Sequence, residues 1–350
     1  MKLRILFFHL FAVLIILSCS KRSGEQDTKV SISTNQKERR ADIVIDGKLF
    51  TSYCWPDDVY KPVLYPVFTA SGTEITRGFP LKPRTGEQTD HIHQVGIWLN
   101  YGNVNGIDFW GNGYRGMKEP AGGEIQHVRI DRIESRKGEG ILVTTSNWLV
   151  PGGKVILNER SEFHFSAKGN TRIIDRITKL TATDTTVLFK DTKEGFFAVR
   201  VARQLELPSK TGVNLIDSTG TPSTQKDTLN TGVTGNYLSS EGLQGESVWG
   251  TRAAWMDLYG IINDEKISVV ICDHPKNPGF PTYWHARGYG LFSANPLGWK
   301  DFTQGKEEFN FKIKEKKSAT FRYRVIISSG TYLSTEEINR LAADFGKRYK

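Results

Sequence analysis

Hydrophobic and polar residues alternate through most of the chain after residue 40. The alternation is clearest where polar residues separate Phe163 from Phe165, and it recurs over 309–313 and 321–327. A period of two places successive side chains on opposite sides of the backbone, which is the pattern of a β-strand with one buried face. The sequence therefore predicts an all-β protein.

Tight turns separate the predicted strands. Asp46-Gly47 and Asn105-Gly106 each lie between short apolar runs, and such pairs favour the turns of β-hairpins. Roughly 310 residues of strand are too many for a seven-stranded immunoglobulin sandwich, and no repeat of a propeller is found. We expect one large antiparallel β-sandwich over residues 41–350, with two stacked sandwiches divided near residue 185 as the alternative.

Two segments depart from the strand pattern. Near the C-terminus, Ser334 and Glu337 have the spacing of a capping box, which predicts the start of a helix. Apolar residues then recur on one face of this helix, at Ile338, Leu341, Ala342 and Phe345. We expect it to pack on the outside of the sheets. The second segment, 217–247, is rich in Ser, Thr, Gly and Asn, and is either a disordered insertion or a lid over a site.

The first 18 residues have the pattern of an export signal. Two basic residues, Lys2 and Arg4, precede the apolar run 5–17, which as a helix of about 20 Å is too short to cross a membrane. The sequence Ile-Leu-Ser-Cys that ends at Cys19 resembles the lipobox of bacterial lipoproteins. We therefore expect residues 1–18 to be a signal peptide and Cys19 to be lipidated, with an ordinary secretory signal as the alternative.

Residues 19–40 contain few apolar side chains, so we expect a disordered tether between the lipid anchor and the folded domain. No acidic run follows Cys19, which favours the periplasmic side of the cell envelope over the cell surface. The domain itself contains Cys54 and Cys272, either as a disulfide or as two buried thiols.

The charge of the chain does not indicate a nucleic-acid partner. Its 47 Lys and Arg residues outnumber 38 Asp and Glu residues, but much of the excess lies in the first 40 residues. Residues 41–350 contain 39 basic and 35 acidic residues, and this balance is unlike that of a phosphate-binding surface. The sequence contains no G-x-S-x-G, Walker, C-x-x-C or H-E-x-x-H motif.

Residues with chemically useful side chains gather in four short segments. In the first, His91 and His93 would lie on one face of a strand, close enough to share a metal ion or one substrate. No third ligand follows at a recognised spacing, so a divalent metal, catalytic or substrate-binding imidazoles and structural histidines all stay open. In the second, Asp108 is flanked by apolar residues and would need a hydrogen bond or a cation such as Arg77 if buried.

Trp98 and Trp110 belong to the same region and offer flat apolar surfaces of the kind on which sugars stack. A tryptophan between strands is nevertheless more often part of the core. The third segment places Glu194 before Gly-Phe-Phe at the start of a strand. This carboxylate is either a general acid or base, a ligand for the histidines, or an exposed turn charge.

The fourth segment begins where Asp273-His274-Pro275 breaks a buried strand, so that both polar side chains would emerge at a sheet rim. Further on, the sequence Trp-His-Ala-Arg from Trp284 places His285 and Arg287 on one face. An imidazole beside a guanidinium suits an anionic or enolate-like substrate. The alternative is an ordinary ion pair between Arg287 and Asp273.

The motifs together resemble a known family. They are Thr-Arg-Gly-Phe-Pro at 76–80, Asp-His-Ile-His at 90–93, Gly-Asn-Val-Asn-Gly-Ile-Asp-Phe-Trp at 102–110, Glu-Gly-Phe at 194–196, Asp-His-Pro at 273–275 and Trp-His-Ala-Arg-Gly-Tyr-Gly at 284–290. In this combination the chain is similar to the PmoA-labelled envelope proteins of Bacteroidetes and Planctomycetes, which contain a domain of unknown function. The resemblance implies an all-β domain similar to the galactose-mutarotase-like supersandwich, often encoded among sugar-catabolic genes.

Two observations limit what the resemblance implies. Family members usually have Asp-His-Pro-His-His-Arg-Gly at the first motif, whereas Ile92, Gln94 and Val95 here replace the proline, the third histidine and the arginine. No role of those three side chains is therefore transferred to this chain. The family label names a methane oxygenase subunit, which would cross the membrane several times. Beyond Leu17 no apolar run approaches 18 residues, so we reject that activity.

We expect an exported lipoprotein that is a carbohydrate-active enzyme, a hydrolase, lyase or epimerase acting on a glycoside or sugar derivative, with or without a divalent metal on His91 and His93. The residues assigned to catalysis are His91, His93, Glu194 and His285. Those assigned to substrate binding are Arg77, Asp108, Trp110, Asp273, His274, Trp284 and Arg287. The alternatives are a non-catalytic glycan-binding envelope lipoprotein and a structural envelope protein.

Overall fold

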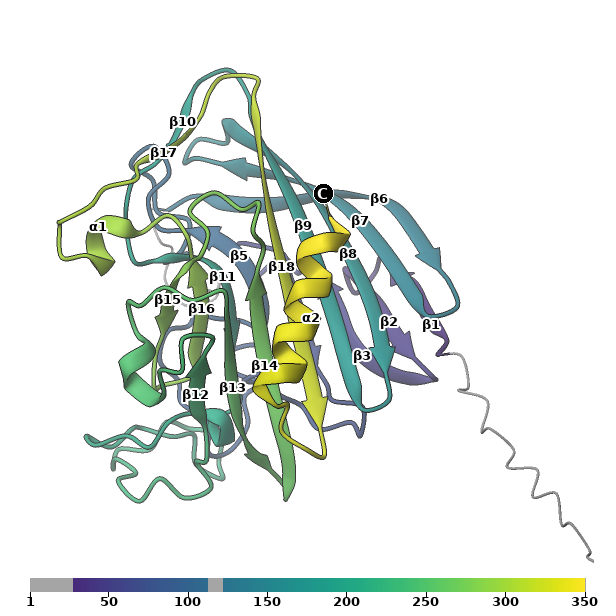
Figure 1. Cartoon of the computed structure of the whole chain (residues 1–350), viewed down its shortest axis with the longest axis vertical. Coiled ribbons are helices and arrows are strands. Elements are labelled where there is room, and N and C mark those ends of the chain that lie inside the picture. The colour runs from purple at the N-terminus through teal and green to yellow at the C-terminus, as the bar shows by residue number, and fades with distance from the viewer. Residues whose placement is uncertain (1–27, 113–121, 350) are drawn as a thin grey trace, which may run out of the picture.

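The computed structural model describes residues 28–112 and 122–349, which form two large antiparallel sheets (Figure 1). Across the first sheet, in order, lie β1 (Val30–Asn35), β2 (Arg40–Ile45), β3 (Lys48–Cys54), β4 (Val63–Val67), β5 (Ile97–Tyr101), β11 (Gly195–Arg200), β16 (Leu291–Asn295) and β15 (Tyr283–Ala286). Across the second lie β12 (Asn236–Ser239), β13 (Trp255–Ile262), β14 (Glu265–Asp273), β18 (Ser318–Ser329), β9 (Thr171–Ala182), β8 (Val155–Lys168), β7 (Glu139–Leu149) and β6 (Glu124–Ser135).

Shorter elements connect the two sheets. β10 (Val187–Phe189) pairs with β17 (Phe311–Ile313) in a two-stranded ribbon. The helical elements are η1 (Arg203–Leu205), η2 (Gly245–Val248), α1 (Trp299–Phe302) and α2 (Thr335–Arg348). No helix among residues 28–112 and 122–349 is long and apolar enough to cross a membrane.

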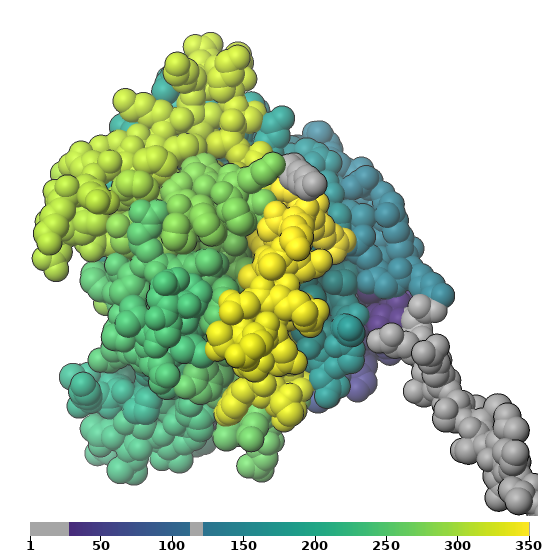
Figure 2. Space-filling model, viewed as in Figure 1, coloured from purple at the N-terminus to yellow at the C-terminus, as the bar shows by residue number. Residues whose placement is uncertain are grey.

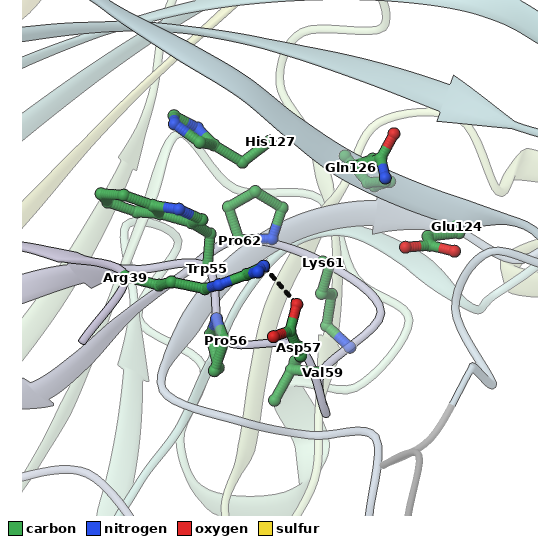
Figure 3. A pocket seen from close by; sticks show the side chains of 11 residues that line it. Arg39, Trp55, Pro56, Asp57, Val59, Lys61, Pro62, Glu124, Gln126 and His127 are labelled. Atoms are coloured by element: carbon green, nitrogen blue, oxygen red, sulfur yellow. Dashed lines mark ion pairs between the residues drawn. The ribbon is translucent and has the colours of Figure 1, made fainter. Parts of the chain in front are cut away.

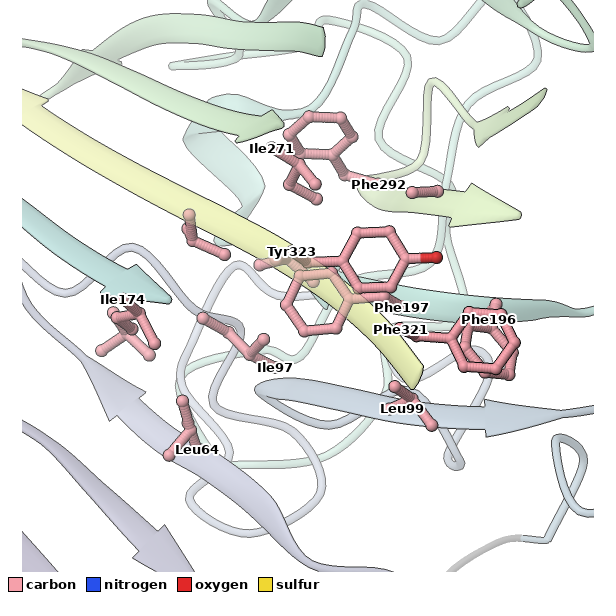
Figure 4. Close-up of a cluster of buried hydrophobic side chains, with 14 of the residues drawn as sticks. Leu64, Ile97, Leu99, Ile174, Phe196, Phe197, Ile271, Phe292, Phe321 and Tyr323 are labelled. Carbon is pink, nitrogen blue, oxygen red and sulfur yellow. The ribbon is translucent and has the colours of Figure 1, made fainter. Parts of the chain in front are cut away.

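The two sheets pack face to face over one hydrophobic core. The ring of Phe197 on β11 stacks on that of Tyr323 on β18, with centroids 4.7 Å apart, and Phe196 contacts Phe321 at 4.3 Å (Figure 4). Burial of these rings removes large apolar areas from water and holds the sheets together. The predicted all-β antiparallel sandwich is therefore confirmed.

The C-terminal helix is also confirmed. Ser334 Oγ accepts a hydrogen bond from the Glu337 amide, and Glu337 Oε2 accepts one from the Ser334 amide, which completes the capping box. The apolar face of α2 packs on the outer face of the second sheet, where Trp255 Nε1 donates to Asn339 Oδ1 at 2.8 Å. Figure 2 shows α2, in yellow, along the surface of the molecule.

The hairpin turns form as predicted. Asp46 and Gly47 have φ values of 51° and 79°, and Asn105 and Gly106 have values of 53° and 84°. These are the left-handed conformations that a primed turn requires, and Asn, Asp and Gly tolerate them best.

The predicted disordered tether over 19–40 is wrong for the part that the structure describes. Residues 30–35 form β1, which pairs with β2, and both Val30 and Ile32 are buried. Two apolar side chains at alternate positions are enough to attach a strand to an existing sheet edge. The predicted signal peptide and the lipidation site Cys19 lie outside the described residues.

Of the two alternatives for residues 217–247, a disordered insertion or a lid over a site, the first is wrong, because the segment is ordered. Val213 and Asp227 exchange main-chain hydrogen bonds, and Ile216 bonds to both Gly86 and Glu87. The later part of this segment contains β12 and η2. The chain therefore forms a structured extension against the 86–88 segment.

The two cysteines of the domain are free thiols. Cys54 ends β3 in the first sheet, and its Sγ contacts the carbonyl oxygens of Ser52 and Tyr65. Cys272 is buried on β14 in the second sheet, beneath α2. Of the two alternatives for these residues, separate thiols and not a disulfide are found.

Candidate functional site

The outer face of the first sheet, opposite the shared core, carries most of the predicted site residues. On β11, Phe197 and Val199 face the core, so Ala198 and Arg200 face outward. Every residue of β11 is nevertheless buried, because loops cover the outer face. Polar side chains that point outward from these strands therefore lie under a covering layer instead of in open solvent.

Three histidines and Glu194 gather around Trp110 on this face. The ring of His93 lies 5.8 Å from that of His91 and 6.3 Å from that of Trp110. The His285 ring lies 6.3 Å from Trp110, and its Nδ1 is 3.9 Å from Glu194 Oε2. We call His91, His93, Glu194 and His285 the imidazole cluster. The structure thus brings together all four residues that were assigned to catalysis.

Two buried arginines, Arg77 and Arg200, hold the segment that carries His91 and His93 in place through hydrogen bonds. Arg77 donates to the carbonyl oxygens of Asp90 at 2.8 Å, His91 at 3.0 Å and Gln94 at 3.1 Å, and to Asp90 Oδ1 at 2.7 Å. Arg200 donates to the same Asp90 oxygen at 2.7 Å and to Gln94 Oε1 at 2.5 Å. Both terminal nitrogens of Arg77 are occupied by these bonds, so the prediction that it binds substrate is wrong, and it shapes the loop instead.

Asp90 links this anchor to His91. Burial alone would raise the pKa of the Asp90 carboxyl, but the hydrogen bond with His91 and the charges of Arg200 and Arg77 outweigh it and lower that pKa. The ionised Oδ2 faces His91 Nδ1. The His91 ring stacks on Tyr289, with centroids 4.6 Å apart and planes within 4°, and 40% of the His91 side chain is exposed. His91 is thereby oriented with Nε2 as its second functional atom.

His285 is the most unusual member of the cluster. It is 1% exposed, and among residues 28–112 and 122–349 neither ring nitrogen makes a hydrogen bond of normal geometry, although the ring faces the Glu194 carboxylate at 3.9 Å and the main chain of Lys193. Burial lowers the pKa of His285 to about 3, and the charges of Arg287 and Lys193 act in the same direction. A buried polar group without a partner costs about 1–3 kcal/mol, so such a group often serves a function.

Glu194 is positioned by a close approach of two loops. The Gly102 amide donates to the Glu194 carbonyl at 2.7 Å, and a Cβ at position 102 would lie 2.7 Å from the Glu194 Cβ. Only glycine fits there. The Glu194 carboxylate pairs with Lys193 and is about one-third exposed, so its second oxygen can face His285.

A buried lysine, Lys61, was not predicted. Lys61 is 1% exposed, and its Nζ donates to the His93 carbonyl at 2.7 Å. Burial lowers the pKa of Lys61 to about 7, although the charge of Asp108 opposes this shift. Burial, followed by the charge of Lys61, also lowers the pKa of His93 to about 3. No local pattern around Lys61 in the sequence distinguishes it from a surface lysine.

The contacts of Trp110 and Asp108 support the fold and do not indicate substrate binding. Trp110 is 2% exposed and packs on Trp98 at 5.4 Å, so its ring does not form the open platform that was expected. Its Nε1 lacks a hydrogen-bond partner within the described parts of the chain. Asp108 Oδ1 accepts from the amides of Trp110 and Gly111, which makes it a turn-forming residue and not a substrate ligand.

Three predicted residues lie away from the imidazole cluster, and their assignment to the same site is wrong. Trp284 points into the core between the sheets, where its Nε1 donates to the Ala253 carbonyl. Asp273 accepts from the amides of His274 and Thr282 and is fully engaged in its own turn. His274 contacts Phe345 of α2, on the opposite face of the sandwich.

Arg287 remains a candidate binding residue. It lines a cavity of about 500 Å³, together with Asp90, Glu206 and Tyr289. Its guanidinium lies 5.1 Å from the centroid of Trp249, and its Nε has no partner among the described residues. The cavity adjoins the imidazole cluster through Tyr289, which stacks on His91.

A separate cavity of about 320 Å³ opens on the other side of Lys61 (Figure 3). The rings of Trp55 and His127 lie in contact at its wall, with centroids 4.3 Å apart and planes tilted by 31°, and Arg39 pairs with Asp57. Burial lowers the pKa of His127 to about 4. None of the imidazole cluster lines this cavity.

The paired histidines do not form a recognisable metal centre. His91 directs Nδ1 at Asp90, and within residues 28–112 and 122–349 no group of three or more His, Cys, Asp or Glu side chains has the arrangement to hold a metal ion. A protein metal site generally needs three or four such ligands. We therefore assign no step to a metal.

Comparison with solved structures gives distant matches. The chain is similar to the GH36 alpha-galactosidase AgaB from Geobacillus stearothermophilus, with 9% identity and a TM-score of 0.39, over 85% of this chain and 41% of that one. It is also similar to a galactose mutarotase related enzyme from Lactobacillus acidophilus, with 9% identity and a TM-score of 0.31, over 86% and 97% of the two chains. The chain thus spans about two-fifths of the galactosidase, and likeness at this level carries no argument about its activity.

No curated protein matches the chain. A family model, in contrast, matches residues 40–343, which include the second sheet, the first sheet except β1, and every member of the imidazole cluster. The chain therefore belongs to the family of unknown function DUF6807.

Proposed function

We propose that the imidazole cluster is the active site of an enzyme that acts on a glycoside or other sugar derivative. The observation that carries the proposal is His285, a buried imidazole beside the Glu194 carboxylate whose two ring nitrogens make no hydrogen bond of normal geometry within the described part of the chain. A folded protein gains nothing from such a group unless a ligand or a reacting atom satisfies it.

The cluster contains the parts needed for paired proton transfer. Burial lowers the pKa of the His285 ring to about 3, so the ring is neutral near pH 7 and accepts a proton from an O–H group only where the Glu194 carboxylate offsets the cost of charging the buried ring. Glu194 then stabilises the imidazolium that forms. His91, whose Nδ1 faces Asp90, donates a proton from Nε2 to the glycosidic oxygen as its bond to the anomeric carbon breaks, and the proton that His285 accepts comes from the O–H group that forms the new bond to that carbon.

The surroundings favour a carbohydrate over other small molecules. The adjoining cavity combines the carboxylates of Glu206 and Glu246 with the guanidinium of Arg287. Sugar hydroxyls both donate and accept hydrogen bonds, so they pair with both kinds of side chain. Tyr289 adds an aromatic surface between this cavity and His91.

We propose further that the enzyme is an exported lipoprotein, on the basis of the sequence that ends at Cys19. Expression with a labelled fatty acid tests this directly. The label should be incorporated into the natural chain and be absent from the Cys19→Ser variant.

The catalytic proposal is tested with a panel of glycosides and oxidised sugars, assayed for binding by calorimetry and for turnover by product analysis. The His285→Leu variant should lose turnover at least 100-fold, which is typical for removal of a general base. The matched control is His164→Gln, because His164 lies on β8 of the other sheet and bonds Glu139 and Glu162. Binding without turnover in the natural protein would support a glycan-binding module instead.

A further inference from the structure

Two cavities of similar volume lie on either side of the segment that carries His91. The first is the cavity of about 500 Å³ described above, which we call the polar cavity. The second has a volume of about 490 Å³, and we call it the apolar cavity. Phe79, Pro83, Ile92, Ile216 and Pro222 form most of its wall.

Residues 88–92 separate the two cavities. Gln88 and Asp90 line the polar cavity, whereas Thr89, His91 and Ile92 line the apolar one. The chain turns at His91, whose φ is 44°, and the His91 ring stacks on Tyr289, which lines the polar cavity. The two cavities therefore meet at this pair of rings, and 40% of the His91 side chain is exposed there.

We use the word insertion for residues 207–247, which are the irregular segment 217–247 together with the ten residues before it, and this insertion contributes to both cavities. Residues 207–211 line the polar cavity, and Ile216 and Pro222 line the apolar one. Ile216 accepts a hydrogen bond from the Gly86 amide and donates one to the Glu87 carbonyl, both at 2.8 Å. The insertion and the dividing segment are thus fixed to each other, which makes the two cavities parts of one arrangement.

The two cavities suit ligand groups of different chemistry, because their walls differ in polarity. The polar cavity presents carboxylates, a lysine and an arginine. In the apolar cavity His91 is the sole titratable side chain among its described lining residues. Exposed apolar walls favour an apolar occupant by about 25 cal/mol for each Å² removed from water. A cavity of this size accommodates an aromatic ring or a short aliphatic group.

We propose that the substrate is a glycoside with an apolar aglycone, whose sugar occupies the polar cavity and whose aglycone occupies the apolar cavity. This inference rests on the proposed function and specifies its substrate class. A glycosidic bond that joins the two groups passes over the partly exposed His91 ring, where the two cavities meet. The position of His91 fits its role as the proton donor to the oxygen of that bond.

The inference is tested with matched pairs of ligands that share a sugar, namely phenyl and methyl glycosides of glucose and galactose in both anomeric forms. For at least one sugar, the phenyl glycoside should bind about tenfold more tightly than the methyl glycoside. Ile92→Asn and, independently, Pro222→Ser should each reduce this ratio to below threefold while the affinity for the methyl glycoside stays the same. Two separate variants guard against a folding defect in either one.

The control variant is Leu229→Asn, because Leu229 belongs to the same insertion, is 84% exposed and lines neither cavity. This variant should keep the full phenyl preference. Equal binding of phenyl and methyl glycosides by the natural protein would overturn the inference and leave the proposed function intact. If no member of any pair binds and the wider sugar panel is also inert, the proposed function fails, and the inference fails with it.

Discussion

At the scale of single residues, the cluster is defined by imidazoles that the fold keeps uncharged. Burial lowers the pKa values of His93 and His285 to about 3, so both rings are neutral near pH 7. His91 differs, because it is partly exposed and faces the ionised Asp90. The cluster thus combines two imidazoles that are neutral near pH 7 with one that is partly exposed beside a carboxylate.

The free energy of folding should reveal the cost of the unpartnered His285. His285→Leu removes two unsatisfied polar atoms from a buried position, so we expect the variant to be more stable by ~1 kcal/mol. The comparison is His274→Leu, since His274 Nδ1 accepts a hydrogen bond from the Lys276 amide and its loss should destabilise the fold by a similar amount. Urea denaturation of both variants measures the difference, and a destabilised His285→Leu would show that His285 has a structural role.

Acid should weaken the fold through these same histidines. An unfolded histidine has a pKa of about 6.5, whereas folded His93 and His285 have values of about 3. Between these values the unfolded chain binds protons that the folded chain does not, so the free energy of unfolding falls as pH decreases from about 6.5 to 3. In the His93→Gln and His285→Gln double variant, the fall measured by urea denaturation at several pH values should be shallower. An unchanged dependence of the unfolding free energy on pH would contradict the burial of His93 and His285.

At the scale of elements, the 88–94 segment depends on one carboxylate. Asp90 is the shared partner of buried Arg77 and Arg200, so Asp90→Asn leaves two cations poorly compensated. We expect a loss of about 3 kcal/mol in stability, measured by thermal denaturation, together with loss of ligand binding. Asp131→Asn provides the control, because Asp131 pairs with the exposed Arg129 and its loss should cost less than ~0.5 kcal/mol. Equal effects of the two variants would contradict the proposal that Asp90 holds the 88–94 segment in place.

Local sequence patterns were sufficient to predict most elements, because hairpin turns and the α2 capping box depend on neighbouring residues alone. They failed for β1, where only Val30 and Ile32 mark the strand and its stability comes from the partner β2. Local patterns also led to the wrong assignment of both Trp284 and His285 to one site. These neighbours on β15 point to opposite sides of the first sheet, one to the core and one to the cluster.

At the scale of the whole molecule, the sandwich positions the cluster by fixing the first sheet against the second. Phe197 on β11 stacks directly on Tyr323, while its neighbours Ala198 and Arg200 face the site. Phe197→Ala should therefore cost about 4 kcal/mol, as measured by urea denaturation. Phe309→Ala, at a half-buried position near the α1 end, should cost less than half of this. A similar cost for both would mean that the contact between the sheets is not the main source of stability.

The convergence of the cluster could be predicted only in part. His91, His93, Glu194 and His285 were proposed as one site from residue types that strand patterning left unexplained, and the fold does bring them together. The same reasoning wrongly added His274, since a sequence does not state which of two sheets a strand will join. Lys61 could not be found, because its burial depends entirely on distant contacts.

The most direct test of the central claim is imidazole ¹⁵N NMR during titration with a glycoside from the panel. Each of the six histidines beyond residue 90 provides its own signal: His91, His93, His127, His164, His274 and His285. We expect the resonances of His91, His93 and His285 to shift with one common affinity, and those of His127, His164 and His274 to stay in place. Shifts confined to His127, in the separate cavity beside Trp55, or no shift at His285 under saturating ligand, would contradict the assignment of the site.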